Sequence, residues 1–156
     1  MTYFLQETPV SRWENQYTVR MSPMRILVVD DERTIADTLS LILRGVGYEA
    51  FTAYDGLLGL SAARELLPNL VLSDVVMPGL DGVEMAIKIR NSLPQVQVLL
   101  FSGQAGTVEL LRLAEERGFH FEIMEKPVHP AEILRKVAST LASANQSSGN
   151  PGPLHN

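Results

Sequence analysis

Short apolar runs alternate with longer segments of helical periodicity along most of this chain. Four runs are strongly apolar, and a weaker one covers residues 48–53; the four are 26–29, 70–72, 98–101 and 121–124. Runs of this length that end in polar or turn residues are typical of buried strands. Their alternation with helix-length segments predicts an α/β fold, in which helices cover both faces of a parallel sheet of five strands.

Five amphipathic segments supply the helices. The first covers about residues 34–44, where apolar side chains recur at helical spacing until two glycines end it. Asp55 is a suitable N-cap for the second helix, and Gly118 is a suitable residue at the C-terminal end of the fourth. The later helices are predicted at about 55–67, 83–91, 105–117 and 130–141.

Both ends of the chain depart from this pattern. Residues 1–23 carry aromatic side chains without sustained periodicity, which predicts an N-terminal extension outside the fold. Residues 143–156 are rich in Ser, Asn, Gly and Pro, and such a composition cannot bury enough apolar surface to offset its ordering entropy. We therefore expect one domain over residues 24–142 and a disordered tail over 143–156.

Composition excludes several classes of function. A net charge of −5 without a Lys/Arg-rich block argues against direct nucleic-acid binding, which needs a basic surface. The absence of cysteine excludes disulfides and thiolate metal sites. No run approaches the roughly 18 apolar residues of a membrane span, and the N-terminal residues do not resemble a signal peptide. These features predict a cytoplasmic protein with neither a nucleic acid nor a membrane as partner.

Polar side chains follow four of the predicted strands at the point where each strand ends. Asp30 and Asp31 follow the first, Asp74 the third, Ser102 the fourth and Lys126 the fifth. In an open parallel sheet the ligand site lies outside the carboxyl ends of the strands. If these strands are neighbours, the five side chains converge on one site.

Each of these residues has an ordinary structural interpretation. An aspartate before a helix is commonly an N-cap, and an aspartate before a Pro-Gly stretch commonly serves a turn. A serine can cap, and a lone lysine is usually solvated. Together, however, the four interpretations require coincidental placement at four separate strand ends, so the sequence favours a joint chemical role.

The residue types suit phosphoryl chemistry with a divalent cation. Adjacent carboxylates are ligands for a hard ion such as Mg²⁺, and a cation offsets the repulsion among three acids. A carboxylate can act as a nucleophile towards phosphorus. A hydroxyl can donate to a phosphoryl oxygen, and a lysine places a point charge on it.

The motifs at these positions resemble the receiver domain of two-component response regulators. They are Val28-Val29-Asp30-Asp31-Glu32, Ser73-Asp74 with the stretch 75–82, Ser102-Gly103 and Lys126-Pro127. The resemblance runs from about residue 24 to 141. It implies a flavodoxin-like (βα)5 doubly wound fold with a five-stranded parallel sheet of order 2-1-3-4-5.

The resemblance also implies a role for each matching residue. Asp74 is expected to accept a phosphoryl group from the phosphohistidine of a sensor kinase. Asp31 and Asp74 are expected to bind Mg²⁺ together with the backbone carbonyl of Val76, with Asp30 close to the ion or one of its waters.

Ser102 and Lys126 are expected to engage the phosphate oxygens once Asp74 is modified. No enzymatic activity is implied beyond self-catalysed phosphoryl transfer and autodephosphorylation. One position departs from the family pattern, because Ile123 stands where many receivers carry a Tyr or Phe that turns inward on activation. Phe121 shares its strand face but lies too far along the strand to replace that ring directly.

The function expected first is that of a stand-alone receiver, because fewer than 20 residues follow the last predicted helix. It would signal through a protein partner bound by the fourth helix, fifth strand and fifth helix, as a monomer or weak dimer. A phosphorelay intermediate that passes its phosphate to a histidine phosphotransfer domain remains an open alternative. An aspartyl-phosphate phosphatase needs a second acid two residues after its nucleophile, where this chain has Val76. A flavin protein would need a Ser/Thr/Gly-rich loop in place of Asp-Asp-Glu.

Overall fold

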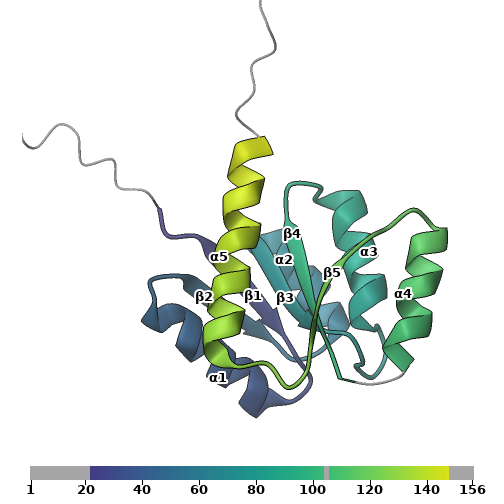
Figure 1. Ribbon diagram of the computed structural model, residues 1–156, viewed down its shortest axis with the longest axis horizontal. Coiled ribbons are helices and arrows are strands. Elements are labelled where there is room, and N and C mark those ends of the chain that lie inside the picture. The colour runs from purple at the N-terminus through teal and green to yellow at the C-terminus, as the bar shows by residue number, and fades with distance from the viewer. Residues whose placement is uncertain (1–21, 104–105, 148–156) are drawn as a thin grey trace, which may run out of the picture.

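The structure is a computed structural model that describes residues 22–103 and 106–147. Its strands and helices alternate along the chain as predicted (Figure 1). The strands are β1 (Arg25–Val29), β2 (Glu49–Ala53), β3 (Leu70–Asp74), β4 (Gln97–Ser102) and β5 (Glu122–Glu125). The helices are α1 (Arg33–Gly45), α2 (Gly56–Leu66), α3 (Gly82–Ser92), α4 (Gly106–Glu116) and α5 (Pro130–Ser147).

All pairings in the sheet are parallel, and the strand order is β2-β1-β3-β4-β5. This order confirms the predicted doubly wound fold. It places the carboxyl ends of β1, β3 and β4 side by side in the middle of the sheet, with β5 next to β4. The residues that follow these strands therefore reach a common edge.

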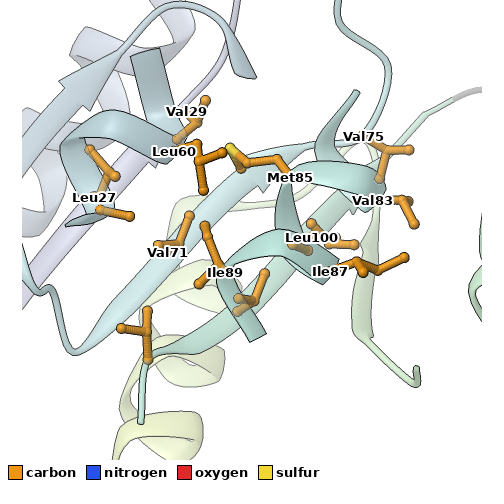
Figure 2. Packing of buried hydrophobic residues seen from close by; sticks show 14 of the residues in the cluster. Leu27, Val29, Leu60, Val71, Val75, Val83, Met85, Ile87, Ile89 and Leu100 are labelled. Atoms are coloured by element: carbon orange, nitrogen blue, oxygen red, sulfur yellow. The ribbon is translucent and has the colours of Figure 1, made fainter. Parts of the chain in front are cut away.

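Strands β1 and β3 are buried because helices cover both faces of the sheet. Ile26 and Val28 pack into the cluster with α1 and α5, whereas Leu27 and Val29 pack into the cluster with α2 and α3. Figure 2 shows the second cluster, in which α3 places Met85 against the sheet. Burial on both faces explains why these strands are continuous apolar runs rather than alternating ones.

Two helix ends have the chemistry that the sequence predicts. The Asp55 carboxylate accepts a hydrogen bond of 2.7 Å from the Leu58 N–H at the start of α2. At the end of α4, Gly118 has a φ of 85°, a left-handed conformation that glycine adopts without steric cost.

Helix α5 is longer than predicted, and the prediction of a disordered tail from residue 143 is wrong for residues 143–147. These residues continue the helix past Leu141, its last fully buried side chain. Alanine is the strongest helix former and stands at 142 and 144. The Ser143 hydroxyl donates to the Ser139 carbonyl at 3.0 Å, so this polar side chain finds its hydrogen-bond partner within the helix.

The predicted extension over residues 1–23 lies outside the described residues except for Ser22 and Pro23, as does the predicted tail beyond Ser147. Within the described part of the chain, no helix has both the length and the apolar character that a membrane crossing requires.

Candidate functional site

Asp30 is a buried carboxylate at the end of β1, with 1% of its surface exposed. Its Oδ1 accepts a hydrogen bond of 2.9 Å from the Glu32 N–H, and its Oδ2 is buried without a hydrogen-bond partner. Neither Asp30 nor Asp31 is the N-cap of α1, because that position belongs to Glu32, whose side chain makes no capping bond. Capping therefore does not explain the paired acids.

The pKa of Asp30 is raised to about 6, chiefly by burial, and the neighbouring carboxylates Asp74 and Asp31 contribute to the same rise. The hydrogen bond from Glu32 and the charge of Lys126 act in the opposite direction. Desolvation disfavours the charged form of an acid, so a nearby cation would stabilise the ionised carboxylate.

Asp74 ends β3 and is 9% exposed. Its Oδ1 accepts a hydrogen bond of 2.9 Å from the Val75 N–H and lies 3.2 Å from Lys126 Nζ. The hydroxyl of the buried Ser73 donates to the Asp74 carbonyl at 2.8 Å. Both the side chain and the backbone of Asp74 are therefore held in place.

Lys126 is positioned by the end of β4. Its N–H donates to the Ser102 carbonyl at 2.7 Å, and the peptide bond to Pro127 is cis. A Cβ at Gly103 would lie 3.2 Å from Lys126 Cδ, so the glycine leaves room for the lysine stem on its way to Asp74.

The site is a cavity of about 640 Å³ at the carboxyl edge of the sheet. Its walls come from the loops after β1, β3, β4 and β5, and its lining is Asp31, Glu32, Asp74, Val76, Met77, Pro78, Gly103 and Lys126. Ser102 is half-buried at the end of β4 and is not part of this lining. Asp30 lies outside this lining and, together with Lys126, lines an adjoining apolar cavity of about 450 Å³.

Asp30, Asp31 and Asp74 form a group that fits a hard cation. Each offers one carboxylate oxygen, and these oxygens lie within 4.8 Å of one another. The unpartnered Oδ2 of Asp30 is the kind of buried oxygen that a ligand would satisfy. Oxygen-only donors of this charge suit Mg²⁺, as predicted.

Gly82 supports the site and was not singled out from the sequence. A Cβ at this position would come within 2.0 Å of the Asp74 carbonyl oxygen, and the Gly82 N–H donates to the Val75 carbonyl at 2.7 Å. The sequence signal was the Asp81-Gly82 pair, which indicates a turn but not what the glycine touches.

The fold and this edge of the sheet define a doubly wound α/β domain with an acidic, lysine-containing site at the carboxyl ends of its strands. Comparison with known proteins gives the family. Residues 26–138 match the family model of the response regulator receiver domain, so the chain belongs to this family of two-component signalling proteins.

Two similar proteins of known sequence are named as regulatory proteins. The chain is 37% identical over 117 residues to the DNA-binding response regulator MtrA of Mycolicibacterium paratuberculosis, covering 75% of this chain and 51% of that protein. It is 31% identical over 119 residues to the probable transcriptional regulatory protein TcrX of Mycobacterium tuberculosis, covering 76% and 50%. The chain thus spans about half the length of these relatives.

Solved structures show the same fold. A CheY-like response regulator receiver domain protein from Methanospirillum hungatei has a TM-score of 0.74 and 29% identity, over 81% of this chain and 99% of that one. NtrX from Brucella abortus has a TM-score of 0.70 and 31% identity, over 81% of this chain and 28% of that one.

Proposed function

We propose that Asp74 accepts a phosphoryl group from a histidine kinase or histidine phosphotransfer protein in a Mg²⁺-dependent reaction. The observation that carries this proposal is the position of the Asp74 carboxylate, which contacts Lys126 and lies beside two further acids in an open cavity. A receiver of this family needs a carboxylate that is held in place yet accessible from solvent.

The contacts of Asp74 suggest which oxygen reacts. Oδ1 is held by the Val75 N–H and by Lys126, which leaves Oδ2 to attack phosphorus. As the new O–P bond forms, the bond from phosphorus to the histidine nitrogen breaks, and the imidazole takes up a proton. Lys126 then neutralises charge on the transferred phosphoryl oxygens, and the Ser102 hydroxyl donates a hydrogen bond to one of them.

Asp30, Asp31, Asp74 and the carbonyl of Val76 are the groups that would hold Mg²⁺. When bound, the ion offsets the negative charge of the acids and of the incoming phosphoryl group. The backbone around Val76 is fixed by the bond between the Gly82 N–H and the Val75 carbonyl, so this ligand needs little reorganisation.

We propose that the modified domain acts through a protein bound at α4, β5 and α5. The net charge of −5 and the absence of a basic block support a protein rather than a nucleic acid as the direct partner of this segment. A charge change of about −1.5 to −2 at Asp74 is the event that would alter this face.

Intact mass measurement tests the phosphoacceptor. The native chain should gain one phosphoryl group when incubated with Mg²⁺ and a small acyl phosphate, and EDTA should prevent this. Asp74→Asn should lose the adduct, because an amide is not nucleophilic towards phosphorus. Asp81→Asn is a matched control in the same loop, since its side chain caps α3 rather than lining the cavity. An adduct that survives in Asp74→Asn, or that forms equally in EDTA, would contradict the proposal.

A further inference from the structure

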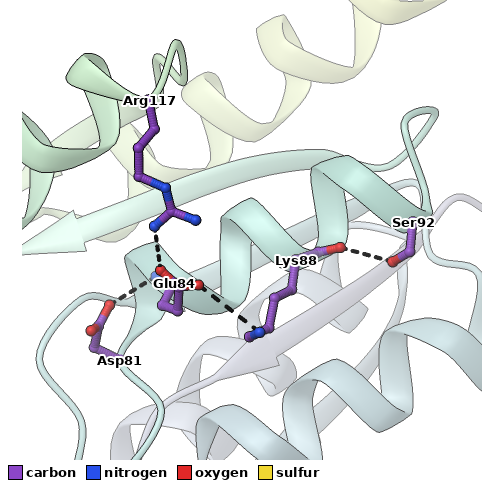
Figure 3. A network of polar contacts seen from close by, with 5 residues as sticks. All are labelled: Asp81, Glu84, Lys88, Ser92 and Arg117. Carbon is purple, nitrogen blue, oxygen red and sulfur yellow. Dashed lines mark hydrogen bonds and ion pairs between the residues drawn. The ribbon is translucent and has the colours of Figure 1, made fainter.

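Helix α1 begins without a side-chain cap, in contrast to α2 and α3. At the start of α3 the Asp81 carboxylate accepts a hydrogen bond of 2.9 Å from the Glu84 N–H (Figure 3), and Asp55 caps α2 in the same way. At α1 the N-cap is Glu32, whose side chain makes no capping bond, and the first turn carries no acidic residue. Helix ends fray, so the start of α1 depends on contacts from elsewhere in the fold.

Tyr54, the residue that follows β2, supplies contacts to this turn of α1. Its hydroxyl donates a hydrogen bond of 2.7 Å to Asp37 Oδ1, and the Arg33 guanidinium carbon lies 4.1 Å from the centroid of its ring. Arg33 and Asp37 are four residues apart and share one face of the helix, so Tyr54 contacts α1 at both ends of its first turn. The Thr52 hydroxyl donates to the Tyr54 oxygen at 3.3 Å, which helps to fix the phenol.

Asp31, just before this turn, is the least constrained of the three acids in the site. Asp30 and Asp74 each accept a hydrogen bond of 2.9 Å from a backbone N–H. The Asp31 carboxylate has no hydrogen bond or ion pair to another residue within the described part of the chain. Its place in the cavity is therefore set by the path of its own backbone.

The end of β2 holds that backbone on both sides of Asp31. Before it, the Asp30 N–H donates to the Ala53 carbonyl at 3.1 Å. After it, the first turn of α1 contacts Tyr54, which is the next residue after Ala53. Tyr54 and Asp31 also line one cavity of about 360 Å³, so the phenol and the carboxylate belong to the same part of the surface.

We propose that Tyr54 is a positioning residue that keeps Asp31 where it binds Mg²⁺. The inference rests on the proposed function of the site, in which Asp31 is a ligand of the ion. Mg²⁺ demands near-ideal octahedral geometry, so a carboxylate on a fraying turn binds it more weakly. A hydrogen bond of ordinary net strength changes an equilibrium by about 2- to 10-fold, and an exposed contact between a guanidinium and a ring by about 2- to 5-fold.

Mg²⁺ titrations of matched variants test this role. Tyr54→Phe removes the hydroxyl and keeps the ring, whereas Tyr54→Leu removes both contacts. Asp37→Ala removes the acceptor from the other side, and Asp37→Asn keeps an acceptor oxygen. Tyr48→Leu is the control, because Tyr48 also packs beside α1 but precedes β2, at the end of the strand opposite to the acids.

Two readouts separate metal binding from phosphate uptake. The first is the Mg²⁺ concentration that half-saturates the shifts of backbone amide NMR signals, measured without a phosphate donor. The second, at saturating Mg²⁺, is the acyl phosphate concentration that gives half-maximal phosphorylation by intact mass. A general loss of structure would change both, whereas a displaced Asp31 changes the first.

Tyr54→Phe and Asp37→Ala should raise the half-saturating Mg²⁺ concentration by about 2- to 10-fold, and Tyr54→Leu by a further 2- to 5-fold. Asp37→Asn and Tyr48→Leu should bind Mg²⁺ as the native chain does. At saturating Mg²⁺ every variant should need the native donor concentration. Native Mg²⁺ affinity in Tyr54→Leu, or an equal loss in Tyr48→Leu, would overturn the positioning role.

The native chain distinguishes this proposal from the function proposed for Asp74. If it binds no Mg²⁺, the positioning role of Tyr54 is overturned. If it binds Mg²⁺ but takes up no phosphoryl group, the function of Asp74 is contradicted, and the Mg²⁺ titrations still decide the role of Tyr54.

Discussion

Asp30 is the residue whose burial is hardest to reconcile with a purely structural role. It is 1% exposed, stands within a group of three acids and leaves one oxygen without a partner. An ionised carboxylate in such a place costs free energy, and this cost is visible in its raised pKa. When no cation is bound, the ionised Asp30 carboxylate therefore lowers the stability of the folded protein.

The pH dependence of stability should show this cost. In the unfolded chain Asp30 loses its proton near pH 3.8, whereas in the folded protein it keeps the proton until about pH 6. Its favourable contribution to folding is therefore complete below pH 3.8 and is lost as the pH rises through 6. Without metal, we expect the free energy of unfolding to fall by roughly 2 to 3 kcal/mol across this window on account of Asp30.

Urea unfolding of the native chain and Asp30→Asn in EDTA, from pH 4 to 7.5, measures this contribution. The variant keeps the acceptor for the Glu32 N–H and removes the charge, so it should be more stable than the native chain at pH 7 and of similar stability at pH 4. Added Mg²⁺ should narrow the difference at pH 7. Parallel pH profiles for the two proteins would show that Asp30 does not titrate as described.

The site residues divide into those that sequence reasoning finds and those that it does not. Asp30, Asp31, Asp74, Ser102 and Lys126 are predicted to converge, because each follows a strand and parallel strand ends share one edge. The structure brings the three acids and Lys126 together, whereas Ser102 lies outside the lining of the cavity. Gly82 matters because it has no Cβ, and the Asp74 carbonyl that it packs against belongs to a residue eight positions earlier in the chain. Only the path of the loop after β3 reveals that contact.

Among the elements, the end of α2 carries a feature that costs stability. Leu67 has φ 46° and ψ 60°, the left-handed conformation in which helices often place glycine, and its side chain is 53% exposed. A residue with a Cβ pays a steric cost there, and little buried surface compensates for it.

Leu67→Gly should therefore raise the free energy of unfolding by about 0.5 to 1 kcal/mol, as read from urea denaturation. Gly118→Ala provides the reverse test, since Gly118 has a φ of 85° and a Cβ there would meet no neighbour. It should lower stability by about 1 kcal/mol through backbone strain alone. A neutral or destabilising Leu67→Gly would contradict this account of the α2 terminus.

Helix ends were predicted less well than helix positions. The strong apolar spacing of α5 stops at Leu141, so no packing contact predicts that the helix continues. Its last turns depend on alanine propensity and on serine hydroxyls that bond within the helix. Such local preferences add up only when a packed helix already provides the nucleus.

For the whole molecule, the strand order follows from the family resemblance and not from periodicity. Alternating apolar runs and helices predict a covered parallel sheet, but several strand orders satisfy that pattern. The relation of the three acids to one another depends on β1 lying beside β3. The pairing of β1 with β3 is therefore what brings Asp30 and Asp31 next to Asp74, and a site built from these three acids in turn requires this strand order.

The proposed partner face gives a prediction at this scale. Val108 on α4 is 71% exposed, and Leu57 on α2 is 68% exposed on a different part of the surface. In a pull-down from cell extract, the phosphorylated chain should retain a partner that the unphosphorylated chain does not. Val108→Glu should abolish this retention and Leu57→Glu should preserve it. Equal recovery in both phosphorylation states would contradict state-dependent binding. Loss of the partner only with Leu57→Glu would place it on the α2 surface instead of the α4 surface.

The close approach of Gly82 to the Asp74 carbonyl has a consequence for how this sequence can evolve. There is no room for a single methyl group at this contact, so the constraint on position 82 comes from the path of the backbone and not from phosphoryl chemistry. A descendant that lost Asp74 and stopped receiving phosphate would still need glycine there to fold in the same way. Retention of this glycine marks shared ancestry of the fold, whereas retention of the acids marks retained signalling.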